Sequence, residues 1–150
     1  MSGNEDIQAA RRLLRAQHSA ALATLSSKLG GHPFVSSVDY LSNEKAQVLI
    51  LISQLAEHTK NIQADARVSL LIQGSPDNVQ ANPRLTLTGT AEPVPEGEIE
   101  TEKQCYLACF PDTEDYFQLD FVLYRIQPLQ LRYVGGPGVA RWIAPGDFAS

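Results

Sequence analysis

A series of short, strand-length segments constrains the fold of this chain more than any other feature. The clearest are a continuous apolar run at 47–53 (QVLILIS) and a segment at 84–91 (RLTLTGTA) in which leucine or glycine alternates with threonine. A continuous apolar run of this length indicates a central strand buried on both faces, whereas a period of two indicates a strand with one buried face. Similar segments predict further strands over 19–25, 33–41 and 67–73.

Helical patterns and turn residues divide the remaining sequence. Pro128 separates a last pair of strands, 121–126 and 129–134, and 74–83 is expected to be a loop. Six or seven strands are more than a parallel doubly wound sheet uses, and their short connections favour antiparallel pairing. The sequence therefore predicts one domain over residues 1–150, a mainly β fold of the α+β class with a barrel and flanking helices. Apolar spacing of three and four residues places these helices at 2–18, 54–64 and 96–110.

Charge and hydropathy argue against two classes of partner. The net charge of −5, without a Lys/Arg cluster that could contact phosphates, argues against nucleic-acid binding. No apolar run approaches the roughly 20 residues that a membrane-spanning helix needs. The N-terminal sequence MSGNEDIQAARR also lacks the apolar core of a signal peptide. A cytoplasmic protein without a membrane contact is therefore expected.

No residue pattern predicts a metal site. The three histidines are far apart in sequence and lack carboxylates at ligand spacing. Cys105 and Cys109 have no second ligand pair to complete a zinc site, so reduced, structural thiols are expected. The acidic stretch 112–120 lacks the ligand spacing and the glycine of a calcium-binding loop, and we expect a solvated loop there.

The junction between the apolar strand and the following helix is the most informative stretch for function. Free N–H groups at a helix N-terminus form an anion site, which hydroxyl and cationic side chains can complete. Ser53, His58, Thr59 and Lys60 are residue types suited to a phosphate. In the alternative interpretation, Ser53 only caps the helix and the other three side chains face solvent.

Two serines lie at the centre of the predicted strand 33–41. Alternation places Ser36 on the same face as Val38, and Ser37 on the opposite face. A buried hydroxyl costs free energy unless it is hydrogen-bonded. Ser36 and Ser37 therefore indicate either a polar ligand or hydrogen bonds across the strands and to solvent.

Three segments resemble the successive signatures of the pyridoxamine 5'-phosphate oxidase-like, FMN-binding split barrels: 31–40 (GHPFVSSVDY), 49–62 (LILISQLAEHTKNI) and 84–89 (RLTLTG). The chain is most similar to the branch related to the HugZ-type haem-utilisation proteins. The segment 135–142 (GGPGVARW) resembles the glycine loop of that branch, which usually has an aromatic residue in place of Pro137. The resemblance covers nearly the whole chain. It implies a six-stranded antiparallel split β-barrel that forms a homodimer, with two FMN molecules at the subunit interface.

The resemblance also implies which residues contact FMN. Within the strand-to-helix junction, His58, Thr59 and Lys60 are expected at the phosphate. The full first set comes from the second strand and this junction: Ser36, Ser37, Val38, Ile52, Ser53, His58, Thr59 and Lys60. A second set could reach the flavin of the partner subunit: Arg84, Arg141 and Trp142.

Two departures from the oxidase pattern reduce the positive charge of the expected site. The oxidase has an arginine where Ser36 stands and a lysine where His58 stands. Serine and a partly protonated imidazole form weaker charge-assisted hydrogen bonds than a guanidinium does. FMN would then bind with modest affinity, or its phosphate would depend on Lys60 and the helix N–H groups. The substrate-binding signature of the oxidase is absent, so pyridoxine phosphate is not expected as substrate.

Three functions are compatible with the sequence. The main hypothesis is an FMN-dependent oxidoreductase that acts on an unidentified small molecule, with the flavin performing the redox step. The alternative is a haem-binding or haem-degrading protein with His32 and His58 as iron ligands, although the haem-utilisation proteins carry a further C-terminal segment. The third is a non-catalytic flavin-binding module. Some members of the superfamily use F420 in place of FMN.

Overall fold

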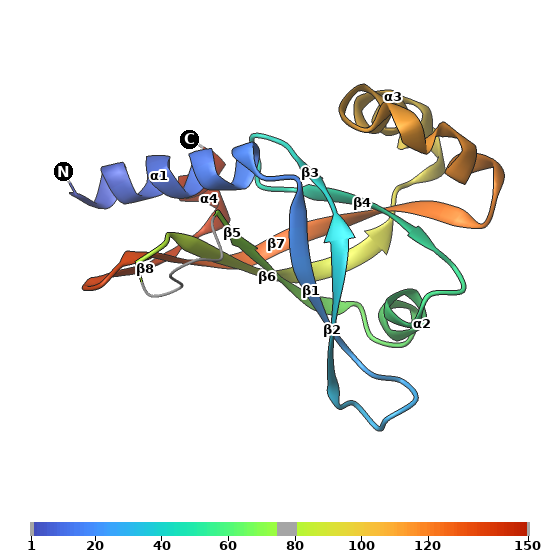
Figure 1. The fold of residues 1–150 in the computed structure, drawn as a ribbon, viewed down its shortest axis with the longest axis horizontal. Helices are drawn as coiled ribbons and strands as arrows, with labels where there is room; N and C mark the ends of the chain where they lie inside the picture. The colour runs from blue at the N-terminus through green and yellow to red at the C-terminus, as the bar shows by residue number, and fades with distance from the viewer. Residues whose placement is uncertain (1, 75–80, 150) are drawn as a thin grey trace.

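The strands form one antiparallel sheet that curls into a half-barrel, with helices packed around it (Figure 1). The computed structural model describes residues 2–74 and 81–149, so most of the loop predicted over 74–83 lies outside the described residues. Two segments, η1 and η2, are 3-10 helices. The elements in chain order are α1 (Ser2–Ala16), β1 (Ser19–Leu25), β2 (Pro33–Asp39), β3 (Leu41–Ser42), β4 (Val48–Ser53), α2 (Glu57–Ala64), β5 (Arg67–Gln73), β6 (Arg84–Pro93), η1 (Glu96–Glu98), α3 (Ile99–Cys109), η2 (Pro111–Gln118), β7 (Phe121–Gly136), β8 (Val139–Ile143) and α4 (Pro145–Ala149).

The topology confirms the predicted antiparallel barrel of the α+β class. The strand order is β2-β1-β5-β6-β7-β4-β3, and β8 pairs with β7. All of these pairs are antiparallel. The described residues form eight strands rather than six, because β3 and β8 are short additions. Burial alternates along β1, β5 and β6, so every second side chain of these strands enters the core.

The apolar strand β4 is buried on both faces, as predicted, but it is not central. It lies next to the short edge strand β3. Ile50 and Ile52 pack in the main core, whereas Leu49 packs with Leu123 and Tyr106 in a second cluster. Helix α3, which carries Tyr106, therefore covers the second face of this strand.

The two strands predicted on either side of Pro128 are one continuous strand, β7. A bulge accommodates the proline: Gly89 of β6 is opposite Pro128, and the preceding Thr88 is opposite Gln130. Leu129 is left without a partner and is 70% exposed. Because proline lacks the N–H that a regular ladder uses, a bulge is a place where a strand tolerates it. The predicted break was wrong for this reason.

The three predicted helices are present, and a further short helix, α4, was not predicted. Helix α2 begins at Glu57 rather than at 54, and the helix predicted over 96–110 is η1 followed by α3. The acidic stretch expected to be a solvated loop contains the 3-10 helix η2. Within the described residues, none of the helices has the length and apolar character needed to cross a membrane.

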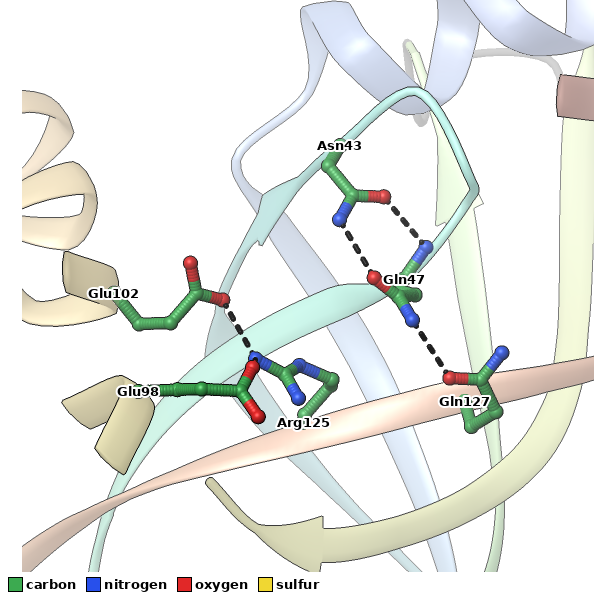
Figure 2. A network of polar contacts seen from close by, with 6 residues as sticks. All are labelled: Asn43, Gln47, Glu98, Glu102, Arg125 and Gln127. Atoms are coloured by element: carbon green, nitrogen blue, oxygen red, sulfur yellow. Dashed lines mark hydrogen bonds and ion pairs between the residues drawn. The ribbon is translucent and has the colours of Figure 1, made fainter. Parts of the chain in front are cut away.

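A partly buried ion pair fixes the start of α3 on the sheet (Figure 2). Arg125 of β7 donates from Nη2 to Glu98 at 2.9 Å and to Glu102 at 3.2 Å. The Arg125 side chain is 19% exposed, so these carboxylates replace much of the water that the guanidinium loses. Nearby, the Gln47 amide donates to Gln127 Oε1 at 2.8 Å and links the β3–β4 turn to β7. The ion pairs of Arg125 therefore position α3 over β4.

The bulge makes Gly89 sensitive to substitution. A Cβ at this position would overlap the carbonyl oxygen of Gln127 in the paired strand, which cannot move aside as a flexible side chain can. We expect Gly89→Ala to lower the free energy of unfolding by about 2–3 kcal/mol in urea denaturation. Gly97→Ala is the control, because a Cβ there meets nothing within 4 Å, and a change below about 0.5 kcal/mol is expected. Equal effects of the two substitutions would contradict this account of the bulge.

Candidate functional site

A cavity of about 250 Å³ lies between the strand-to-helix junction and the α3–η2 segment. Its walls come from elements far apart in sequence. Five of the eight residues predicted at this site line the cavity: Ser37, Val38, Ile52, Ser53 and His58. The remaining lining residues are Asp39, Leu51, Ala56, Tyr106, Thr113, Tyr116 and Phe121. The cavity therefore combines hydroxyl, carboxyl and imidazole groups with an aromatic wall formed by Tyr106, Tyr116 and Phe121.

His58 of α2 is hydrogen-bonded to Ser36 of β2, with 2.9 Å between Nδ1 and Oγ. The sequence left open whether Ser36 contacts a ligand or another group of the chain. In the structure its hydroxyl is hydrogen-bonded to an imidazole of the same chain. Burial lowers the pKa of His58 below its ordinary value of 6.5. The imidazole is therefore mostly neutral near pH 7, and its Nε2 is not engaged by Ser36.

The Ser53 hydroxyl and a backbone N–H of the junction, which were predicted to bind a phosphate, are hydrogen-bonded to a carboxylate of the chain. The Ser53 hydroxyl donates to Asp120 Oδ2 at 2.6 Å, and the backbone N–H of Leu55 donates to the same oxygen at 3.3 Å. The hydrogen bond from Ser53 lowers the pKa of Asp120, so this carboxylate is ionised at neutral pH. A carboxylate thus lies where the sequence predicted a bound anion. Ser53 is also not the helix cap, because Ala56 occupies that position.

Thr59 and Lys60, also predicted at the phosphate, lie outside the lining of this cavity. Thr59 is fully buried, and its hydroxyl donates to the carbonyl of Ser53 at 2.6 Å. Lys60 is exposed on α2 and does not line the cavity. Among the described residues, the lining of this cavity includes one carboxylate residue, Asp39, and no Lys or Arg. The cavity therefore offers no cation to a dianionic phosphate.

The second predicted set lies away from this cavity, on β6 and β8 (Figure 1). Arg141 pairs with Asp6 at 3.0 Å between Nε and Oδ2. Trp142 is 63% exposed, with the guanidinium of Arg132 over its ring at 5.1 Å. Arg84 donates to the carbonyl of the nearby residue 82 at 3.4 Å. A single chain therefore does not bring the eleven predicted residues together.

The other histidines do not join His58. His32 is exposed in the turn between β1 and β2 and does not line the cavity. His18 lies 3.6 Å from Cys109 Sγ through its Nδ1. In the described ranges, no group of three or more His, Cys, Asp or Glu side chains is arranged to hold a metal ion.

The aromatic wall and the hydrogen bond between Ser53 and Asp120 were not predicted from the sequence. Tyr116 stacks on Phe121 with ring centroids 4.7 Å apart, and Tyr106 packs on Phe110 at 4.8 Å. The acidic stretch hid this arrangement, because its carboxylates suggest solvent exposure. The available signal was the pair of aromatic residues within PDTEDYFQ, which a fully solvated loop does not need.

Comparison with known proteins gives two relatives by sequence and a family. The model of the family described as CREG, beta-barrel matches residues 2–150. The chain is 32% identical over 143 residues to the chloroplastic heme oxygenase HOZ of Arabidopsis thaliana, covering 95% of this chain and 44% of that protein. It is 30% identical over 137 residues to the heme oxygenase HutZ of Vibrio cholerae, covering 85% of this chain and 74% of HutZ. The chain thus spans less than half the length of the Arabidopsis relative.

A solved structure that is similar to this chain is also named for haem. The heme binding protein of Mycobacterium smegmatis superposes with a TM-score of 0.85 at 26% identity, covering 96% of this chain and 60% of that one. These three proteins are named for haem. The prediction of FMN as the main cofactor is therefore contradicted, and haem, the alternative, fits the relatives better. In physical terms, no Lys or Arg stands among the described residues that line the cavity, so a phosphate would find no permanent positive charge there.

The half-barrel topology, the match to the family model over residues 2–150 and the similarity to HutZ agree with one another. The sequence signatures had indicated the same superfamily from three separate segments. The chain belongs to the CREG β-barrel family, a group with the pyridoxamine 5'-phosphate oxidase-like split-barrel fold, and its relatives agree with the HugZ-related branch.

Proposed function

We propose that this chain binds haem and takes part in haem degradation. The observation that carries the proposal is the similarity to the heme oxygenase HOZ, which extends over 95% of this chain at 32% identity. The similarity to HutZ and to the mycobacterial heme binding protein supports it. Haem itself is then the small-molecule substrate.

The chemistry of the cavity supports a haem ligand. A neutral imidazole is a common axial ligand of haem iron, and burial lowers the pKa of His58 so that the neutral form persists at pH 7. The lining also contains the aromatic side chains of Tyr106, Tyr116 and Phe121. These rings fit the flat, apolar ring system of haem, whose two propionates would lie outside the described lining, which lacks Lys and Arg.

In this proposal, His58 would hold the iron through Nε2 in the tautomer whose Nδ1–H donates to Ser36 Oγ, because only that tautomer leaves the Nε2 lone pair free. A hydrogen bond to the second ring nitrogen fixes the tautomer and orientation of a metal-binding histidine. Haem, when bound, supplies an iron centre for oxygen chemistry. The apolar side chains of Val38 and Ile52 would exclude water. Burial raises the pKa of Tyr106, so its hydroxyl stays protonated and can only donate or accept hydrogen bonds.

We also propose that a second copy of the chain completes the site. The cavity of about 250 Å³ is smaller than the roughly 300–1,000 Å³ of typical ligand pockets, so part of a haem would extend outside it. Arg141 and Trp142, which the family resemblance associates with the partner's cofactor, lie away from this cavity. In an isologous homodimer, the partner's surface that carries these two residues would lie at the opening of the cavity.

Two further expectations rest on the sequence alone. The extent of the domain, residues 1–150, and a cytoplasmic location stay predictions. The Arabidopsis relative is named as chloroplastic, so the compartment differs among these proteins.

Haem binding is expected to depend on His58. His58→Ala removes the proposed iron ligand, so the Soret maximum should shift and the dissociation constant for haemin should rise at least about tenfold. Titration of the purified protein with haemin, followed by absorbance, measures both quantities.

His32→Ala is the matched control for this experiment, since His32 is exposed and does not line the cavity. FMN added in place of haemin should not be retained on gel filtration. A wild-type protein that fails to bind haemin would contradict the proposed function. Wild-type behaviour of His58→Ala would contradict only the ligand assignment.

His58 should also make folding stability depend on pH. Its pKa is lowered in the folded state, so the unfolded chain binds a proton more readily. The stabilising contribution is therefore fully present above pH 6.5 and declines as the pH falls below that value toward the pKa of the folded state. We expect wild type to lose more stability than His58→Gln between pH 7.5 and 5.5, as measured by urea denaturation at each pH. Parallel losses in both proteins would rule out this role for His58.

The homodimer predicts a solution mass about twice the 16.4 kDa of one chain. Trp142→Ala should weaken the dimer, because an exposed tryptophan stacked by an arginine is typical of residues that dominate interface energy. Light scattering during gel filtration over a range of micromolar concentrations measures the mass of both proteins. A monomeric wild type would remove the basis for a shared site.

A further inference from the structure

Tyr116 and Phe121 form a stacked pair in the lining of the cavity. Their ring planes differ by 15°, and their centroids are 4.7 Å apart. Phe121 begins β7 and is held in register with Ser53 of β4. Tyr116 lines the cavity and is also 43% exposed, so part of its ring borders open space.

Core packing does not account for this pair. Tyr106, on the neighbouring helix, is 2% exposed and belongs to the second hydrophobic cluster, with Phe110 and Phe117 packed against it. Tyr116 and Phe121 belong to neither cluster. A large aromatic side chain that faces a cavity without contributing to the core is suited to contact a ligand.

The backbone holds Tyr116 in a defined position. The N–H of Leu119 donates to the carbonyl of Tyr116 at 3.0 Å, and Thr113 at the start of η2 donates to the carbonyl of Phe110 through its hydroxyl at 2.7 Å. At the other end of the segment, the ion pairs of Arg125 fix the start of α3. The aromatic wall is therefore preorganised, which reduces the entropy lost when a ligand binds.

We propose that Tyr116, supported by Phe121, is a specificity-determining residue that selects a flat aromatic macrocycle by contact with its ring face. This inference rests on the proposed haem function and assigns a part of the site that does not involve iron. An aromatic wall interacts with the π-system of any planar macrocycle. The proposed contact of His58 with the ligand, by contrast, requires a metal. Tyr116 and His58 therefore select two different properties of the same ligand.

The two contributions can be separated with haemin and metal-free protoporphyrin IX. We expect Tyr116→Ala to raise the dissociation constants of both about five- to tenfold, because stacking does not require iron. His58→Ala should weaken haemin binding and leave protoporphyrin IX binding unchanged. Soret absorbance follows haemin, and porphyrin fluorescence follows protoporphyrin IX.

Conservative variants show whether the ring itself matters. Tyr116→Phe keeps the ring and should bind both ligands within about twofold of wild type. Tyr116→Leu keeps an apolar side chain without a ring and should weaken both ligands as Tyr116→Ala does, which provides a second test if the alanine variant does not fold. Leu129→Ala, which changes an exposed side chain of β7 outside the cavity, is the control.

Each outcome has one interpretation. Unchanged binding of both ligands by folded Tyr116→Ala or Tyr116→Leu would overturn the role of Tyr116 and leave the haem proposal intact. Weakened haemin binding with unchanged protoporphyrin IX binding would also overturn it, because the effect would then act through iron. Failure of the wild type to bind either macrocycle would overturn the proposed function together with this inference.

Discussion

The long strand β7 is the element on which the rest of the structure depends. It pairs with β6 over most of its length, with β4 at its beginning and with β8 at its end. A strand with three partners must bend between them, and the bulge at Leu129 provides that bend. The same strand carries Arg125, which fixes α3, and begins at Phe121 in the cavity wall. The core, the helical cover and the candidate site therefore share one strand.

Local patterns were sufficient for the strands that bury one face. The bounds of β1 and β5 match the predicted ranges 19–25 and 67–73, because alternation directly reflects which side chains enter the core. The prediction from local pattern failed where a segment distant in sequence determines whether a strand continues or how it is buried. Pro128 does not end β7, because a bulge at Leu129 shifts the register between β7 and β6 by one residue. The apolar β4 is not central: its second face is buried because α3 packs on it, although the strand lies next to the edge strand β3.

The same limit applies to the candidate site. Residue types at the strand-to-helix junction indicated a candidate site, and five of the eight predicted residues line one cavity. The hydrogen-bond partners of these residues could not be predicted, because local sequence does not show them. Ser53 is bound by Asp120, 67 residues away, and that carboxylate takes the place expected for a phosphate. The aromatic wall likewise comes from a segment whose acidic residues concealed it.

The two departures from the oxidase pattern are the two ends of one hydrogen bond. Ser36 stands where the oxidase has an arginine, His58 stands where it has a lysine, and their side chains lie 2.9 Å apart. Two cations held so close would repel each other unless an anion lay between them. A serine and a neutral histidine satisfy each other and need no anion, so the paired replacement leaves a stable site without a phosphate. It also leaves one imidazole nitrogen unengaged by Ser36, and a neutral imidazole nitrogen is what haem iron binds.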